Sequence, residues 1–429
     1  MSLTQVQTGM ISGVPIQVST NGAITTVSSN NASAITLDGA QNATFTNAVK
    51  TSTITTTAGN NGALAVNAST TFNNNISAPN TFGFKNRIIN GNMAIDQRNS
   101  GSLINPAVNG SYCVDRWTTR TSQTTYYKIQ QNAGSVTPPP GFSNYLGVTS
   151  LNSSSLGSTD YAFIAQYIEG LNCQDLNWGT SNAKTITLSF WVQSSLTGTF
   201  GGAIRNYQNS SNGCYVFSYN IPVSNTWTYV SVTIPGPTTG GSSQWPTTNS
   251  GFLELDFTFG VGATYSGSPG SWLLSNNIAP TGAVSVVGTS GATFYITGVQ
   301  LEVGTQATSF DYRPYGTELA LCQRYFTQLT AGSGAYTGFG AGVWGGTSQG
   351  NIYLKYPTSM RTSPTFNYSN VCVSDGVNNL SVTSVTNFFG GSDSGLVTLA
   401  VSGSTTQYRG AYLSANNNTS AYINFSAEL

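Results

Sequence analysis

The sequence contains no histidine among its 429 residues. Histidine is the side chain that titrates near neutral pH, and it is the commonest general base and metal ligand in proteins. Its absence excludes Ser-His-Asp and Cys-His catalysis and zinc sites with histidine ligands. Carboxylate-only chemistry, of the kind used in glycoside hydrolysis, stays open. With so many catalytic options removed, we expect no metabolic enzyme activity and no cofactor.

Charged side chains are also scarce. They make up 7% of the residues, against roughly 25% in an ordinary globular protein. The 14 basic and 14 acidic residues balance, so there is no positive field to attract nucleic acid or an anionic membrane. Ser, Thr, Asn, Gln and Gly must then cover most of the surface, and these residues favour strands and turns over helices. We predict an all-β protein with no nucleic-acid partner and no membrane insertion.

Five cysteines are spread singly through the chain, without a Cys-x-x-Cys pair. Their odd number and spacing predict neither a disulfide framework nor a zinc site. We expect them to be small buried apolar groups in a protein made in a reducing cytoplasm. The opening residues, MSLTQVQTGMISGVPIQ, have neither the basic nor the apolar segment of a signal peptide, and no stretch predicts a membrane span.

Composition and hydrophobic spacing divide the chain into three regions, of which residues 1–85 are the first. This region is rich in Thr, Asn, Ser and Ala, and short β-branched segments recur in it between Gly or Asn turns. We predict a fibre-shaft region, in which small strands close a core only when several chains wrap together. The alternative is a disordered low-complexity tail.

The second region, residues 86–312, shows the alternation of apolar and polar residues that is typical of strands buried on one face. Clear examples are Ile186–Val192, Val230–Ile234 and Leu253–Phe259. Several such strands joined by long loops predict one β-sandwich of two packed antiparallel sheets. Residues 313–429 predict a small C-terminal β domain with a short leading helix at Thr317–Phe326, capped by Thr317.

Four stretches carry a resemblance to a known family. They are NRIINGNMAIDQR at 86–98 with the later Asp115-Arg116-Trp117, YITGVQLEVGTQATSFDYRPYGTELALCQRYF at 295–326, YPTSMRTSPTF at 356–366, and the terminal SAEL. In these stretches the chain resembles phage tail-fibre and related virion appendage proteins. The opening Leu3–Ile11 is also similar to the short leader of many tail spikes and fibres.

The resemblance implies a homotrimeric tail fibre, a virion structural protein assembled in the host cytoplasm. Its N-terminal region would attach to a protein of the tail or capsid, and its outer β domains would adhere to a glycan of the bacterial host surface. The sandwich is similar to jelly-roll carbohydrate-binding modules by analogy of fold. One alternative is a decoration fibre of capsid or tail with a mainly structural role. A polysaccharide depolymerase is a further alternative, although no long parallel β-helix segment follows residue 80.

Three aromatic residues are predicted to bind the ligand. Trp191 alternates away from the apolar face of its strand, and Trp227 and Tyr229 alternate away from the apolar face of another. Aromatic rings in such positions can pack on the C–H faces of sugars. The alternative is that the rings are buried beneath a loop or against a neighbouring subunit, as tryptophan usually is.

Glu254 and Asp256 share one face of their strand, about 6.6 Å apart by the strand rise. This spacing permits glycoside hydrolysis without favouring it, and we predict no catalytic residue. We prefer a solvated face or a calcium site for the two carboxylates, so the presence of a metal stays open.

Two further groups of charged residues predict structural contacts. Glu302, Asp311 and Arg313 predict a salt bridge that pins the end of the sandwich, with a calcium site as the alternative. Asp115-Arg116-Trp117 is predicted to anchor a loop to the sandwich, since a chain with so few charges can use them to hold one geometry.

Overall fold

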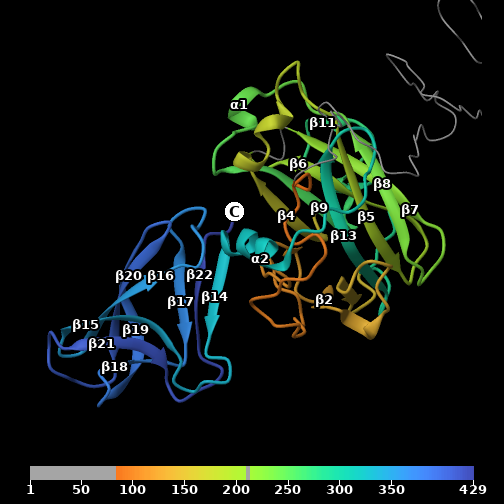
Figure 1. Cartoon of the computed structure of the whole chain (residues 1–429). Helices are drawn as coiled ribbons and strands as arrows, with labels where there is room; N and C mark the ends of the chain where they lie inside the picture. The colour runs from red at the N-terminus through yellow and green to blue at the C-terminus, as the bar shows by residue number, and fades with distance from the viewer. Residues whose placement is uncertain (1–83, 209–212) are drawn as a thin grey trace, which may run out of the picture. The chain divides into compact units, whose positions relative to one another are not determined.

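The computed structural model describes residues 84–208 and 213–429 (Figure 1). Of the shaft region predicted for residues 1–85, residues 1–83 lie outside the described residues. The described part is mostly β, as predicted. Within it, no helix is both long and apolar enough to cross a membrane.

Two antiparallel sheets form a β-sandwich from residues of the second region, as the alternating segments predicted. The first sheet has the order β1 (Thr118–Thr121), β4 (Tyr161–Glu169), β9 (Gly251–Val261), β6 (Gly198–Asn206), β7 (Cys214–Ile221) and β11 (Trp272–Leu273). The second has the order β2 (Tyr127–Gln131), β3 (Leu146–Ser150), β13 (Thr293–Val303), β5 (Ile186–Ser194) and β8 (Thr228–Ile234).

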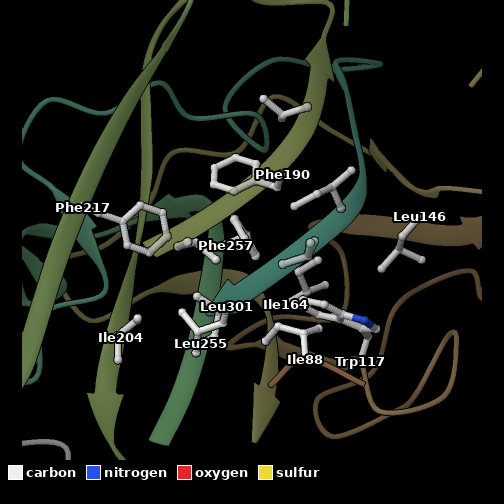
Figure 2. Close-up of a cluster of buried hydrophobic side chains, with 14 of the residues drawn as sticks. Ile88, Trp117, Leu146, Ile164, Phe190, Ile204, Phe217, Leu255, Phe257 and Leu301 are labelled. Atoms are coloured by element: carbon white, nitrogen blue, oxygen red, sulfur yellow. The ribbon is translucent and has the colours of Figure 1, made fainter. Parts of the chain in front are cut away.

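The core of the sandwich lies between the inner faces of these sheets (Figure 2). Phe190 of β5 meets Phe257 of β9 edge to face, with ring centroids 4.9 Å apart. Phe217 of β7 approaches the same Phe257 ring at 5.9 Å. Because each fully buried side chain of this kind contributes roughly 1.5–3 kcal/mol, these contacts favour the observed inner faces of β5, β7 and β9.

Short elements complete the sandwich. The 3-10 turns are η1 (Ala133–Ser135), η2 (Gly170–Asn172), η3 (Gln174–Leu176) and η5 (Ala263–Tyr265), and α1 spans Gly241–Gln244. A parallel pair, β10 (Ser266–Gly267) and β12 (Ala279–Pro280), lies in the segment that follows β9. Ile278 of this segment packs on Phe163 and Ala165 of β4, so the segment covers part of the outer face of the six-stranded sheet.

The C-terminal region contains a three-stranded sheet and a closed barrel (Figure 1). The sheet has the order β14 (Phe326–Thr330), β22 (Tyr422–Ser426) and β17 (Thr365–Ser369). The barrel joins β15 (Gly338–Gly346), β16 (Gln349–Lys355), β20 (Ser394–Val401), β19 (Asn379–Gly390), β18 (Val371–Ser374) and β21 (Gly410–Ala415). One apolar core serves both, and the strands agree with the β structure predicted for this region.

The helix before this domain differs from the prediction. α2 spans Tyr315–Gln323, and Pro314 rather than Thr317 is its N-cap residue, without a side-chain cap. The fixed φ of proline suits the start of a helix, which explains the earlier beginning. Phe326 does not continue the helix because it pairs with Ser426 in the β14–β22 ladder.

The stretches that carry the family resemblance are joined to one another by hydrogen bonds. Asn86 accepts from the Leu301 backbone N–H at 3.0 Å, which links the first stretch to the second. Arg98 pairs with Glu428 at 2.9 Å, and Arg361 donates to the Glu428 carbonyl at 2.8 Å. We call this set of contacts the junction. The residues of the resemblance therefore hold the sandwich against the C-terminal domain.

All five cysteine side chains are buried. This agrees with the prediction that they act as small apolar groups.

Candidate functional site

An exposed aromatic pair lies on the outer face of the five-stranded sheet. Trp191 of β5 is directly opposite Tyr229 of β8, and the ring centroids are 5.3 Å apart at an interplanar angle of 54°. Both rings point away from the core because their strand neighbours, such as Phe190, point into it. Trp191 is half-buried and 45% of Tyr229 is exposed. We call this pair the aromatic platform.

Trp227 does not belong to this platform. Its indole N–H donates to the Thr137 carbonyl at 2.8 Å, and its ring meets Tyr145 at 5.9 Å. Tyr145 in turn packs edge to face on Tyr295 of β13. The ring of Trp227 thus fastens the loop around Thr137 to the sheet, which is the packing alternative considered for it.

Polar groups lie beside the platform on the same face. Ser231 and Thr233 follow Tyr229 on β8 at alternate positions, and both are exposed. Gln193 follows Trp191 on β5 in the same way and is 4% exposed. Within the part of the chain that the structure describes, its Oε1 has no hydrogen-bond partner. The buried Gln193 Oε1 is out of reach of a ligand. The platform therefore offers aromatic faces next to the hydroxyl groups of Ser231 and Thr233, a combination suited to a polyhydroxylated ligand.

The outer face of the six-stranded sheet holds a charged cluster that the sequence did not reveal. Arg205 of β6 reaches Asp256 of β9 through Nε at 2.6 Å and Glu254 through Nη2 at 2.7 Å. Its Nη1 donates to Asn276 Oδ1 at 2.6 Å. All three charged side chains are buried. The predicted solvated face is therefore wrong, because the segment that contains Asn276 covers these residues.

Burial raises the pKa of Asp256 well above its usual value, against the opposing effect of Arg205, while the nearby Glu254 raises it further. No group of three or more Asp, Glu, Cys or His side chains is placed to hold a metal ion in residues 84–208 and 213–429. Arg205 occupies the position between the two carboxylates that the calcium alternative would require. The cluster is a buried ion pair network, which leaves neither carboxylate facing solvent.

Glu302, Asp311 and Arg313 do not form the predicted salt bridge with one another. Glu302 accepts from the Thr308 backbone N–H at 2.8 Å and from its hydroxyl at 2.7 Å. Asp311 accepts from the backbone N–H of Lys85 at 3.0 Å. Arg313 instead pairs with Glu318 of α2 at 3.2 Å. Backbone N–H groups satisfy the carboxylates here, because the loop before α2 folds back on the end of β13.

The triplet Asp115-Arg116-Trp117 anchors its loop, as predicted. Asp115 accepts from the Gln97 backbone N–H at 3.2 Å, and the Trp117 indole donates to the Asn90 carbonyl at 3.1 Å. Arg116 is fully buried and forms an ion pair with Glu428. This places the triplet in the junction rather than at an exposed binding surface.

A pH dependence of stability follows from Asp115. Burial raises its pKa to about 6, against the effect of Arg98, whereas an unfolded chain has an aspartate pKa of about 3.9. Between these values the folded state keeps a proton that the unfolded state has lost, so stability falls as pH rises from about 4 to about 6. We expect the free energy of unfolding, measured with urea, to fall less steeply with pH in Asp115→Asn than in the wild type across this window. Parallel plots of unfolding free energy against pH for the variant and the wild type would contradict this.

No known family model matches the sequence, and no curated protein matches it. Solved structures show distant similarity. One is the enzymatically active domain of bacteriophage CBA120 tailspike protein 4, at 16% identity and a TM-score of 0.26 over 47% of this chain and 22% of that one. The chain thus spans less than a quarter of the tailspike domain.

Two further similar structures are carbohydrate-binding modules. One is TmCBM61 in complex with β-1,4-galactotriose, at 10% identity and a TM-score of 0.24 over 48% of this chain and 99% of that one. The other is the family 11 carbohydrate-binding module of a cellulosomal cellulase of Clostridium thermocellum, at 13% identity and a TM-score of 0.22 over 47% of this chain and 95% of that one. The chain is therefore a mostly β protein with a β-sandwich that is distantly similar to carbohydrate-binding modules and to a phage tailspike domain.

Proposed function

We propose that this chain is a non-enzymatic glycan-binding protein of a phage particle, a trimeric tail fibre that adheres to the bacterial host surface. The observation that carries the glycan-binding part is the aromatic platform of Trp191 and Tyr229. Tryptophan and tyrosine bury large areas when a partner covers them, and their polar edges stay available for hydrogen bonds. An exposed pair with hydroxyl groups beside it suits the apolar face and the hydroxyl rim of a sugar ring.

The charged cluster supports binding rather than hydrolysis. A glycoside hydrolase needs one carboxyl group to protonate the leaving oxygen and a second to attack or to activate water, and both must reach the substrate. Glu254 and Asp256 are buried and share Arg205 as their partner. A ligand on the aromatic platform would lie on the five-stranded sheet, whereas both carboxylates belong to the six-stranded sheet.

The fibre and virion parts of the proposal rest on the stretches that resemble tail-fibre proteins. The balanced charge and the surface of hydroxyl and amide groups are suited to close association of identical chains, because few charges must lose their hydration. Sedimentation equilibrium of the full chain tests the trimer, for which we expect three times the chain mass of 45.0 kDa. A monomer at micromolar concentration would contradict it.

Replacing Trp191 with alanine tests the binding function. We expect affinity for polysaccharide purified from the host surface to fall by at least about tenfold, because tryptophan contacts at binding sites often contribute 2 kcal/mol or more. Surface plasmon resonance on immobilised polysaccharide measures the change. Tyr353→Ala is the matched control, since Tyr353 is 66% exposed on the barrel strand β16, and it should bind like the wild type. Equal binding by wild type and Trp191→Ala would remove the platform from the proposal.

A further inference from the structure

An open cavity of about 420 Å³ lies at the junction between the sandwich and the C-terminal domain. One wall is the three-stranded sheet, which contributes Gln328, Asn367, Asn424 and Ser426. The other wall is the loop that runs from Arg98 to Tyr112. The volume falls within the roughly 300–1,000 Å³ of pockets that hold small ligands.

A row of amide side chains crosses the floor of this cavity. Gln328 of β14 is directly opposite Asn424 of β22, and Asn424 is directly opposite Asn367 of β17. Residues that are directly opposite in neighbouring strands project from the same face of a sheet, so the three amides point into one space. An amide has two donor hydrogens and an acceptor oxygen. Asn424 Nδ2 donates to Gln328 Oε1 at 3.4 Å, and Gln328 Nε2 donates to the Gln97 carbonyl at 2.9 Å, so each keeps part of its hydrogen-bonding capacity, while Asn367 at the edge strand is exposed.

Aromatic rings flank the amide row. Tyr422 lies two residues before Asn424 on β22 and therefore on the same face, and Tyr112 faces it from the loop wall. Both rings are half-buried. Ser426 adds a hydroxyl group on the far side of Asn424. Amides, hydroxyls and flanking rings can together contact the hydroxyl groups and the C–H face of a sugar.

The charge of the cavity favours a neutral ligand. Arg98 is the one charged side chain among the lining residues. Its guanidinium carbon lies 3.5 Å from the Phe326 ring centroid and 4.4 Å from that of Tyr112. Its terminal nitrogens pair with Glu428 at 2.9 Å and with Asp115 at 3.5 Å. The cation is already paired with two carboxylates, so an anionic ligand gains little from it.

We propose that this cavity is a second saccharide-binding site, which takes an uncharged sugar unit of a surface polysaccharide. It shares only the class of ligand with the proposed function, because its residues lie on other strands than Trp191 and Tyr229. With two sites, one chain could bind a single polysaccharide at two points or bind two neighbouring polysaccharides at once. Such linkage raises the overall affinity above that of either site.

The test uses the full chain and saturation-transfer NMR with galactose, glucose, N-acetylglucosamine and sialic acid as probes. In the Trp191→Ala/Tyr229→Ala variant, which lacks the platform, at least one of the three neutral sugars should still bind. Adding Asn367→Ala and Gln328→Ala to this variant should weaken that binding by about tenfold or more, as expected for lost hydrogen bonds. Asn387→Ala, an exposed amide on the barrel strand β19, is the matched control and should leave it unchanged.

The outcomes separate the two proposals. If the wild type binds a neutral sugar and the platform variant does not, the cavity is not a saccharide site and the platform proposal stands. If the platform variant binds like the wild type and the amide variants do not bind, the cavity proposal stands and the platform fails. Binding of sialic acid alone overturns the neutral ligand class, and no binding of any probe by any variant overturns the cavity proposal. Circular dichroism melting of each variant confirms that it is folded.

Discussion

Arg205→Met should lower the free energy of unfolding by about 3–5 kcal/mol, the usual cost of removing one partner from a buried ion pair. Arg205 is the shared partner of Asp256 and Glu254, at 2.6 and 2.7 Å. Without it, two carboxyl groups remain in a buried space where the charged form is poorly solvated. Methionine keeps most of the volume of the side chain, so the loss reports the charge rather than a cavity.

Urea unfolding followed by tryptophan fluorescence measures this effect. The loss should become smaller as pH falls, because burial raises the pKa of Asp256 and its carboxyl group can then take up a proton when Arg205 is absent. Adding Glu254→Gln and Asp256→Asn to Arg205→Met should recover much of the stability, since the remaining neutral amides no longer require a cation. A loss below about 1 kcal/mol at neutral pH, typical of an exposed pair, would show that water reaches the cluster.

Glu428→Ala should be about as destabilising, by roughly 3–5 kcal/mol. Glu428 pairs with both Arg98 and Arg116. Arg116 is 1% exposed, its Nη2 donates to the Tyr167 carbonyl at 2.6 Å, and its guanidinium carbon lies 3.6 Å from the Tyr325 ring centroid. Deleting the carboxylate leaves this cation buried with a neutral acceptor and an aromatic ring, which compensate only part of its lost hydration.

The same variant tests whether the junction couples the sandwich to the C-terminal domain. We expect Glu428→Ala to separate one calorimetric unfolding transition into two, because it removes a contact that links residues far apart in the sequence. Asp175→Ala is the control: its pair with Arg87 is also close, at 2.6 Å, but Asp175 is 46% exposed, so the cost should be under about 1 kcal/mol. If the two variants lost the same free energy of unfolding, the burial of Arg116 would not increase the contribution of its ion pair to stability.

The sequence predicted those parts of the fold that depend on local alternation. Ile186–Val192 and Leu253–Phe259 lie within β5 and β9, and their apolar residues form the core. A strand with a side-chain period of two and one apolar face can bury that face in only one way. The outward direction of Trp191 and Tyr229 follows from the same alternation, and the structure agrees with it.

The same alternation could not say what covers the other face of a strand. Glu254 and Asp256 point away from the core as predicted, yet they are buried, because the segment around Asn276 and Ile278 returns over the sheet. Nothing in the sequence indicates that β6 pairs with β9, which is what brings Arg205 opposite Glu254. Strand pairing between distant segments is a non-local property, and a single sequence carries little sign of it.

Composition by itself determined the class of this protein: without histidine and with few charges, it was expected to be a β-rich chain with a neutral, polar surface. Local patterning determined its strands and their inner faces, because these depend on neighbours one or two residues apart. Only the tertiary structure decided which outer positions are exposed. In it Tyr229 is exposed and Trp191 half-buried, Trp227 packs against Tyr145, and Glu254 and Asp256 are buried around Arg205. Three amides are also aligned beside the junction. These outcomes depend on which distant segment packs over each face.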